Sequence, residues 1–473
     1  MRIERDCIGE MFVPDNVLYG IHSLRAKHNF PITDEKVDHA VIQSYLQIKK
    51  AAAEANELAG TLDKQKSTLI MSACNQLLFS NDYSAFIVPA IQGGAGTSTN
   101  MNVNEVVAQL AMRLGTQSGN EPVEIKPNDD VNQSQSTNDT YPTAGKMAML
   151  KRLSPLLTSV SKLVDSLTDK ADEYKSAIKV GRTQLQDAVP TTFGRTFNAY
   201  ASMFKRDILR LKHAQKVLSQ VNLGGTAIGT GINATDDYQD TIIPILNKYS
   251  HLNLHQAADL VDGTQNSDAF TTISGAMKSL AADLSKFSND LRLLSSGPQA
   301  GLNELELPKK AAGSSIMPGK VNPVIPEVVN QVAFEAIGND VTVTMAAEAG
   351  QLELNAFEPI MFKSILTSEM HLTRAIDTLV DNCVSDIKVN VEYCRNEVEH
   401  SSIAATVLSP LLGYEKTTAL IKEALATKQS VKEIVKQKQL LPDTLVDNLF
   451  TPEVLTNVSK VKDERTAAGS TLN

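Results

Sequence analysis

The chain has 473 residues and a formal net charge of −9, and 42% of its residues are hydrophobic. At about 150 residues per domain, this length predicts roughly three domains or one large elongated unit. The balance of 45 basic against 54 acidic residues argues against a nucleic-acid partner, because such binding needs a basic surface. With no long run of apolar residues, no membrane span is expected.

Cysteine and histidine positions offer no metal site. The four cysteines, Cys7, Cys74, Cys383 and Cys394, are scattered without a CxxC pair, which is typical of free thiols in a reducing cytosol. No HExxH or paired-histidine spacing is present. The charged start MRIERD differs from a secretory signal peptide, so a cytoplasmic location is predicted.

The first part of the chain changes from irregular to helical. Pro, Gly and Asn interrupt residues 1–35, where we expect loops with short strands. Residues 41–60 are rich in helix formers and end on Gly60, which predicts a helix. Further long helices are expected at 195–222, 323–348 and 359–387.

The clearest periodicity is a heptad seam over residues 273–294. Its apolar positions alternate in steps of four and three, at Ile273, Met277, Leu280, Leu284, Phe287, Leu291 and Leu294. Such a helix spans about 35 Å at 1.5 Å per residue, and Gly297-Pro298 ends it. Several long helices with narrow seams favour an elongated bundle shared between subunits.

Beyond the long helices, the sequence indicates shorter ones. SVKE at 430–433 fits a capping box, and Thr451-Pro452-Glu453 fits an N-cap with Pro at the first helical position. We therefore predict a mainly all-α chain of three domains: an N-terminal domain over 1–140, a central long-helix bundle over 141–395 and a small helical C-terminal domain over 396–473.

Four polar stretches stand between the helical patterns. They are GGAGTSTNMNVNE (93–105), SQSTND (134–139), GRTQLQDAVP (181–190) and GSSIMPGKVNP (313–323). One such cluster usually caps a helix, but four together favour an anion site, because helix N-termini with hydroxyl and amide side chains bind anions.

Two segments resemble nucleotide-binding motifs but lack their required spacing or context. GSSIMPGK has five residues between its glycines, where a phosphate loop needs four, and Val321 follows the lysine where Ser or Thr is required. GTGINA (229–234) follows the helical run AQKVLSQVNL rather than a strand.

These four stretches, in this order, resemble the aspartase/fumarase superfamily, whose signature is GSSIMPGKVNP. YGIHSLRA (19–26) and Leu185 in GRTQLQDAVP are similar to the aspartase branch. The resemblance implies an L-aspartase-like three-domain fold, with a tetramer core of about twenty helices. It also implies a homotetramer whose active sites are shared between subunits, and a small dicarboxylate substrate.

The resemblance further implies an aspartate ammonia-lyase, which converts L-aspartate reversibly to fumarate and ammonia. Ser314 would be the base that removes the Cβ proton, giving an enediolate intermediate. The substrate would be surrounded by Thr97, Ser136, Thr137, Asn138, Thr183, Gln184, Ser315, Lys320 and Asn322. Many relatives carry His where this chain has Gln184, and a neutral amide can orient the amine but not relay a proton.

This chemistry suits the residues. The doubly negative enediolate needs preorganised donors, which Lys320, hydroxyl groups and backbone N–H groups of a glycine-rich lid supply. No metal or other cofactor is predicted, and activation by Mg²⁺ stays an open alternative. The alternatives are a fumarate hydratase or another fumaryl-forming lyase, and a non-catalytic descendant of the fold. The presence of Ser314, Lys320 and Asn322 argues against the last.

Overall fold

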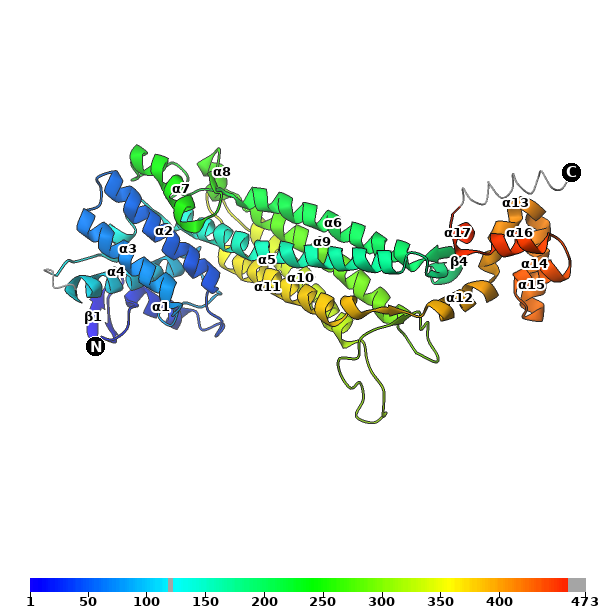
Figure 1. Cartoon of the computed structure of the whole chain (residues 1–473). Coiled ribbons are helices and arrows are strands. Elements are labelled where there is room, and N and C mark those ends of the chain that lie inside the picture. Colours follow the sequence, from blue (N-terminus) through cyan, green and yellow to red (C-terminus); the bar gives the residue numbers. More distant parts are fainter. Residues whose placement is uncertain (118–121, 458–473) are drawn as a thin grey trace. The chain divides into compact units, whose positions relative to one another are not determined.

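The computed structural model describes residues 1–117 and 122–457, and it is built mainly from helices (Figure 1). The all-α prediction is confirmed. In chain order the α-helices are α1 (Ile21–Asn29), α2 (His39–Leu58), α3 (Lys64–Ser80), α4 (Thr97–Gln117), α5 (Thr137–Glu173), α6 (Phe193–Leu218), α7 (Asp236–Ser250), α8 (Leu260–Gln265), α9 (Asp268–Leu294), α10 (Val324–Glu348), α11 (Glu358–Asn382), α12 (Val391–His400), α13 (Ser409–Leu412), α14 (Tyr414–Thr427), α15 (Val431–Gln437), α16 (Asp443–Leu449) and α17 (Pro452–Leu455).

Strands are few and short. The pairs are β1 (Arg2–Arg5) with β2 (Glu10–Val13), β3 (Ile178–Thr183) with β4 (Gln186–Thr192), β5 (Gln220–Val221) with β6 (His255–Gln256), and β7 (Leu305–Glu306) with β8 (Lys388–Val389). Only the β5–β6 pair is parallel within the described ranges. A π-helical turn, η1, covers Pro127–Val131, and 3₁₀ turns η2 and η3 cover Val384–Asp386 and Ser402–Leu408.

Two compact units share the chain, and the long helices run through both. Unit 1 comprises Met1–Thr158, Asp207–Ala282 and Val332–Arg374. Unit 2 comprises Ser159–Arg206, Asp283–Gln331 and the chain from Ala375 onward. The three-domain division at residues 140 and 395 stays a prediction, and its last part, from residue 458, lies outside the described residues.

The long helices follow their sequence patterns closely. Helix α2 begins at His39, where the Asp38 side chain accepts the Ala40 N–H, and it ends just before Gly60. In α9, six of the seven seam side chains are buried and Leu294 is half-buried. The seam therefore packs within the chain itself and is not a surface left for another subunit.

Helix α6 ends earlier than predicted. It stops at Leu218 rather than residue 222, because Gln220–Val221 pairs with His255–Gln256 as strands. The predicted helical run AQKVLSQVNL is thus helical through Leu218 and wrong after it, and GTGINA follows a loop after a short strand. Helix α11 likewise ends at Asn382, and a 3₁₀ turn replaces its expected last turn.

Helix α1 lies where only loops and short strands were expected. Its N-cap residue, Gly20, has no side chain to cap the helix. Two distant carboxylates do so instead: Glu4 accepts the Ile21 N–H at 2.7 Å, and Glu105 accepts N–H groups of Gly20 and His22 at 2.9 and 2.8 Å. The sequence pattern misses this helix because its cap comes from elsewhere in the chain.

Helix α5 contains two prolines, Pro142 and Pro155, which would normally break it. Pro142 lacks the N–H that would bond the carbonyl of Asn138, four residues earlier. The Asn222 side-chain amide donates to that carbonyl at 3.0 Å instead. A tertiary contact thus satisfies the orphaned group and keeps the helix continuous.

The C-terminal helices form a separate hydrophobic cluster within unit 2. Its buried side chains include Leu408, Leu420, Ile434 and Leu449. The capping box is confirmed, because Ser430 and Glu433 bond each other's backbone N–H groups. Pro452 occupies the first position of α17 as predicted, but the Thr451 hydroxyl bonds the Asn448 carbonyl rather than capping.

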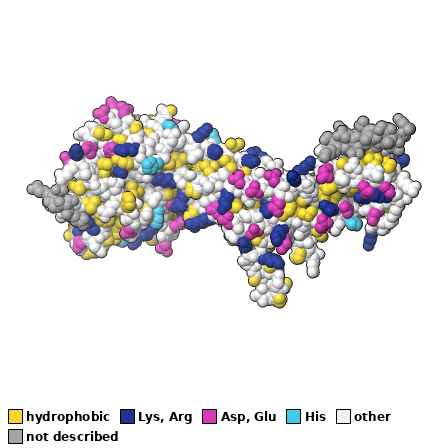
Figure 2. All heavy atoms as spheres, viewed as in Figure 1, with side chains coloured by type: hydrophobic (Ala, Val, Ile, Leu, Met, Phe, Trp, Pro, Cys, Tyr) yellow, Lys and Arg dark blue, Asp and Glu magenta, His cyan; other side chains and the backbone are white. Residues whose placement is uncertain are grey.

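The described surface agrees with the mixed composition. On the face drawn in Figure 2, acidic and basic side chains are interspersed rather than gathered into one field. In residues 1–117 and 122–457, no helix combines the length and the apolarity that crossing a membrane requires.

Glu358, the first residue of α11, is an ionisable group inside unit 1. Its side chain is 5% exposed, and burial raises the pKa of its carboxyl to about 8, while the charge of Lys146 opposes the shift. The pKa of Lys146 is lowered, also by burial. The folded state therefore favours the neutral acid and binds its proton more tightly than the unfolded chain does.

A Glu358→Gln variant should reveal this linkage. The raised pKa stabilises the wild type fully below about pH 4.5, and that stabilisation is lost as the pH rises towards 8. Relative to the variant, the unfolding free energy of the wild type should fall by on the order of 4 kcal/mol across that window. Denaturant titration at several pH values measures it, with exposed Glu353→Gln as the control; a difference independent of pH would contradict the assignment.

Candidate active site

The first polar stretch leads into helix α4, and Thr97 lies exposed in its first turn. Gly96 just before it has φ 83°, and a Cβ there would come within 2.3 Å of the Tyr141 ring. Tyr141 belongs to the second turn of α5. The glycine therefore lets the Thr97 segment pack directly against the start of α5.

The second stretch, SQSTND, forms the start of α5. The Asp139 carboxylate is fully buried and accepts the N–H groups of Ser136, Gly224 and Thr226 at 3.0–3.1 Å. Burial raises the pKa of Asp139 to about 6, although these donors oppose the shift. The Asn138 side-chain amide donates to the Ala227 carbonyl at 2.7 Å. The stretch is thus fixed to the loop after β5.

These two stretches meet through Asn100. It lies one turn after Thr97 on α4, and its Nδ2 donates to the Thr137 hydroxyl at 3.1 Å. The structure therefore brings together four of the residues that the sequence assigned to the substrate, which are Thr97, Ser136, Thr137 and Asn138.

The third stretch is the tip of a β-hairpin, which sequence analysis did not identify. Thr183 pairs with Gln186, so Gln184 and Leu185 form a two-residue turn. Both have positive φ, 52° and 62°, and both side chains are exposed. Two such residues in a row suit the twist of a hairpin but give no Gly or Asn signal in the sequence.

One buried carboxylate holds this hairpin. Glu304 is 2% exposed and forms ion pairs with Lys179, at 2.6 Å, and with Arg182. Both cations belong to β3, the strand that ends on Thr183. The arginine of the GRT sequence is therefore a structural anchor for the threonine beside it.

The fourth stretch is a closed loop between α9 and α10. Its base is pinned where Gly313 N–H donates to the Lys320 carbonyl at 2.7 Å and the Asn322 amide donates to the Gly313 carbonyl at 3.0 Å. Ser314 is half-buried, whereas Ser315 and Lys320 are exposed.

The Ser314 oxygen accepts two backbone hydrogen bonds. The N–H groups of Ile316 and Met317 donate to it at 3.1 and 2.8 Å. Hydrogen bonds to the charged form of an acid favour ionisation. These two N–H groups would therefore stabilise an oxyanion at Ser314.

The ten predicted residues divide between the two units. Thr97 and the 136–138 segment belong to unit 1, whereas Thr183, Gln184 and the 313–323 loop belong to unit 2. Sequence reasoning missed the supporting residues Lys49, Asn100, Asn132 and Glu304. A signal for Asn100 was present, since it lies within the polar stretch 93–105, but Lys49 sits in an ordinary helical pattern.

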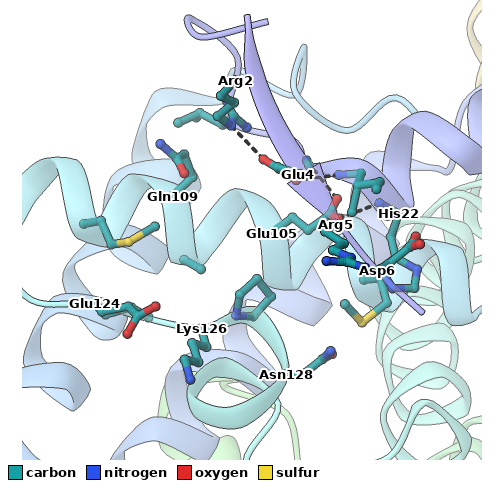
Figure 3. Close-up of a pocket in the computed structure, with 18 of the residues that line it drawn as sticks. Arg2, Glu4, Arg5, Asp6, His22, Glu105, Gln109, Glu124, Lys126 and Asn128 are labelled. Atoms are coloured by element: carbon teal, nitrogen blue, oxygen red, sulfur yellow. Dashed lines mark hydrogen bonds and ion pairs between the residues drawn. The ribbon is translucent and has the colours of Figure 1, made fainter. Parts of the chain in front are cut away.

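A cavity of about 500 Å³ in unit 1 contains none of the ten residues (Figure 3). It lies between β1, α1, α4 and the π-helical turn. Figure 3 shows Arg2 reaching Glu4, and Arg25 pairs with Asp6 at 2.7 Å. Glu105, also at its wall, caps α1. These charges are engaged with each other or with backbone N–H groups.

Comparison with known proteins identifies the class of this protein. A family model described as "Lyase" matches residues 9–338, and one described as "Fumarase C C-terminus" matches residues 405–457. The chain therefore belongs to the lyase family, as its resemblance to the aspartase/fumarase superfamily led us to expect.

Individual relatives are similar over nearly the whole chain. A Helicobacter pylori protein described as aspartate ammonia-lyase is 49% identical, covering 96% of this chain and 97% of its own. One from Bacillus subtilis is 43% identical, covering 96% of each. The solved structure of a Brucella melitensis fumarate lyase:delta crystallin is 45% identical with a TM-score of 0.91, covering 95% of this chain and 98% of its own. A class II fumarase from Schistosoma mansoni is 32% identical, also at 0.91, covering 96% and 99%.

A Glu304→Gln variant should loosen the hairpin that carries Thr183. Without the carboxylate, the buried Lys179 ammonium loses its counter-charge, and we expect a loss of about 3 kcal/mol in unfolding free energy. Denaturant titration measures it. The neighbouring Glu306 is exposed, so Glu306→Gln is the matched control and should change stability by less than about 0.5 kcal/mol. Equal losses of unfolding free energy in the two variants would show that Glu304 does not anchor the hairpin.

Proposed function

We propose that the chain is an aspartate ammonia-lyase, which removes ammonia from L-aspartate to give fumarate. One observation carries the proposal: proteins described as aspartate ammonia-lyase match it at 43–49% identity over about 96% of its length. The loop geometry at Ser314 supports it. A carbon–nitrogen lyase of this kind needs a base for a Cβ proton and donors for a dicarboxylate, and the four polar stretches contain both.

In the proposed reaction, the Ser314 oxyanion takes the Cβ proton of aspartate. The N–H groups of Ile316 and Met317 stabilise the oxyanion before the transfer. The electron pair of the broken C–H bond moves into the adjacent carboxylate and gives the enediolate. It then forms the C=C bond as the C–N bond breaks, ammonia leaves, and the proton on Ser314 passes to solvent.

Donors around the substrate would supply the remaining stabilisation. Lys320 and Asn322 would hold one carboxylate, and Ser315 would donate to the carboxylate that becomes the enediolate. Thr97, Ser136, Thr137 and Asn138 would surround the rest. Thr183 and Gln184 would face the leaving amine, and the neutral amide of Gln184 would orient rather than protonate it.

Fumarate hydratase is the second candidate, and the 32% identity to a class II fumarase favours it specifically. Both reactions pass through the same kind of enediolate and give fumarate. They differ in the leaving group, which is ammonia from aspartate or water from malate.

We propose further that the protein works as a homotetramer. Helix α10 carries an apolar face of Phe334, Val341 and Met345, each more than half exposed in the single chain. These positions are seven and four residues apart, so they share one side of the helix. Apolar side chains on one helix face are typical of a helix that packs against other copies. A cytoplasmic location fits the four unpaired thiols.

Substrate turnover tests the function. Fumarate formation, followed by its absorbance, should proceed with aspartate and not with malate. Ser314→Ala should lower kcat by about 10²–10⁴-fold, since it removes the base. The exposed Ser154→Ala is the control for the substitution itself. Turnover of malate without aspartate would identify a hydratase, and full activity of Ser314→Ala would remove the serine from its role.

Complementation tests the shared sites. Ser314→Ala removes the proposed base from unit 2, and Thr137→Val removes a proposed substrate-binding hydroxyl from unit 1. If each site combines units from different subunits, co-expressing the two weak variants should create some intact sites. With random mixing about a quarter would be intact, and aspartate turnover should recover accordingly. Size-exclusion chromatography checks that mixed tetramers form. Mixed tetramers with no recovered activity would place all residues of one site in one chain.

A further inference from the structure

Lys49 is a buried cation that none of the assigned roles uses. It lies on α2, its side chain is fully buried, and its ammonium donates to Asn132 Oδ1 and Gln135 Oε1 at 2.9 Å each. Both acceptors belong to the loop just ahead of α5. Burying an ammonium costs several kcal/mol unless its partners compensate. An apolar side chain would fill the same space without this cost.

The contacts of Lys49 continue towards the substrate segment. Asn132 Oδ1 also accepts from Asn100 Nδ2 at 3.1 Å and from Asn104 Nδ2 at 3.2 Å. Asn100 Nδ2 donates in turn to the Thr137 hydroxyl at 3.1 Å. Three hydrogen bonds therefore join Lys49 to a residue assigned to the substrate.

The direction of these bonds is set by the cation. An ammonium only donates, so Asn132 must turn its oxygen towards Lys49. That oxygen accepts from Asn100, which must then present its nitrogen, and the second N–H on that nitrogen reaches Thr137. The Thr137 oxygen becomes an acceptor within the protein, which leaves its own O–H free to donate outward.

The hydrogen bonds from Lys49 through Asn132 and Asn100 to Thr137 form a relay, and two nearby groups favour the charged form of its lysine. Burial lowers the pKa of Lys49 to about 7, whereas Asp139 on α5 and Cys74 on α3 oppose the shift and so favour the ammonium. Among the residues that the structure describes, the buried Asn100 Oδ1 has no hydrogen-bond partner. The amide therefore gives up one bond to hold this orientation.

We propose that Lys49 is a positioning residue, which acts through Asn132 and Asn100 to present the Thr137 hydroxyl as a hydrogen-bond donor to a substrate carboxylate. This inference rests on the proposed function, which places Thr137 beside a dicarboxylate. It adds a group more than eighty residues away in the sequence that touches no substrate atom.

A double-mutant cycle with Thr137→Val is the test. Lys49→Met keeps an unbranched side chain but removes every donor. It should lower kcat/KM for aspartate and weaken inhibition by succinate, a non-reacting dicarboxylate, each by about tenfold or more. In the Thr137→Val background the same change should alter kcat/KM by less than about twofold, because the hydroxyl on which Lys49 acts is absent.

Two further variants separate positioning from folding. Asn100→Ala breaks the relay without touching the charge, so it should reproduce the loss and also be non-additive with Thr137→Val. Lys146→Met removes another buried lysine, which donates to the Gln220 carbonyl at 2.8 Å outside the relay. The fold-changes in kcat/KM caused by Lys146→Met and by Thr137→Val should therefore multiply in the double variant.

Independent, multiplying effects of Lys49→Met and Thr137→Val would overturn the proposal, as would an Asn100→Ala enzyme with unchanged kcat/KM. Should Lys49→Met fail to fold, the Asn100→Ala cycle decides alone. A wild type that converts malate but not aspartate would refute the proposed function only. The same cycle run with malate would still test the relay, since malate carries the same two carboxylates.

Discussion

The carboxylate of Asp139 accepts three backbone N–H groups from two separate segments. The candidate site residues of unit 1 depend on these hydrogen bonds for their positions. A loop exposes backbone groups that a helix would pair internally, and buried groups without partners cost free energy. Asp139 meets this cost for the start of α5 and for the loop after β5 together. The hydrogen bonds of Asp139 thereby fix the positions of the three residues before it, Ser136, Thr137 and Asn138.

Remote carboxylates play the same part at two other places in the chain. Glu304 pairs with Lys179 and Arg182 on β3 and so holds the hairpin that ends in Thr183. Glu105 and Glu4 cap α1 from other elements. Each of these carboxylates is remote in sequence from the cations or backbone N–H groups that it binds. These partners come from a strand (Glu4 on β1), a helix (Glu105 on α4) and an irregular segment (Glu304), so tertiary packing rather than one kind of element supplies them.

The signature loop differs from these segments in how it is held. Its closing bonds are local, between Gly313 and Lys320 and between Gly313 and Asn322. Ser314 receives its two donors from the next turn of the same loop. Local closing bonds let such a loop keep its internal geometry if it moves as a unit, which would suit the lid that the proposed reaction needs.

How far the sequence predicted the fold can be judged from particular helices. The heptad in α9 and the helix formers in α2 identified long helices, since a local apolar period is enough to define a buried face. The same reasoning missed α1, whose caps come from Glu4 and Glu105, and it did not single out α5, whose Pro142 is compensated by Asn222. It also missed the β3–β4 hairpin, because Gln184 and Leu185 carry no turn signal.

The sequence by itself determined the helical class, the order of the polar stretches and the candidate residues for the proposed chemistry, because residue type and spacing are local properties. Tertiary structure alone decided that Asn100 on α4 bonds Thr137, that Arg182 is an anchor, and that Lys49 faces the loop before α5. Those contacts join residues far apart in the chain. No local pattern records them, since the cost of burying a charge is met only by partners that the fold brings to it.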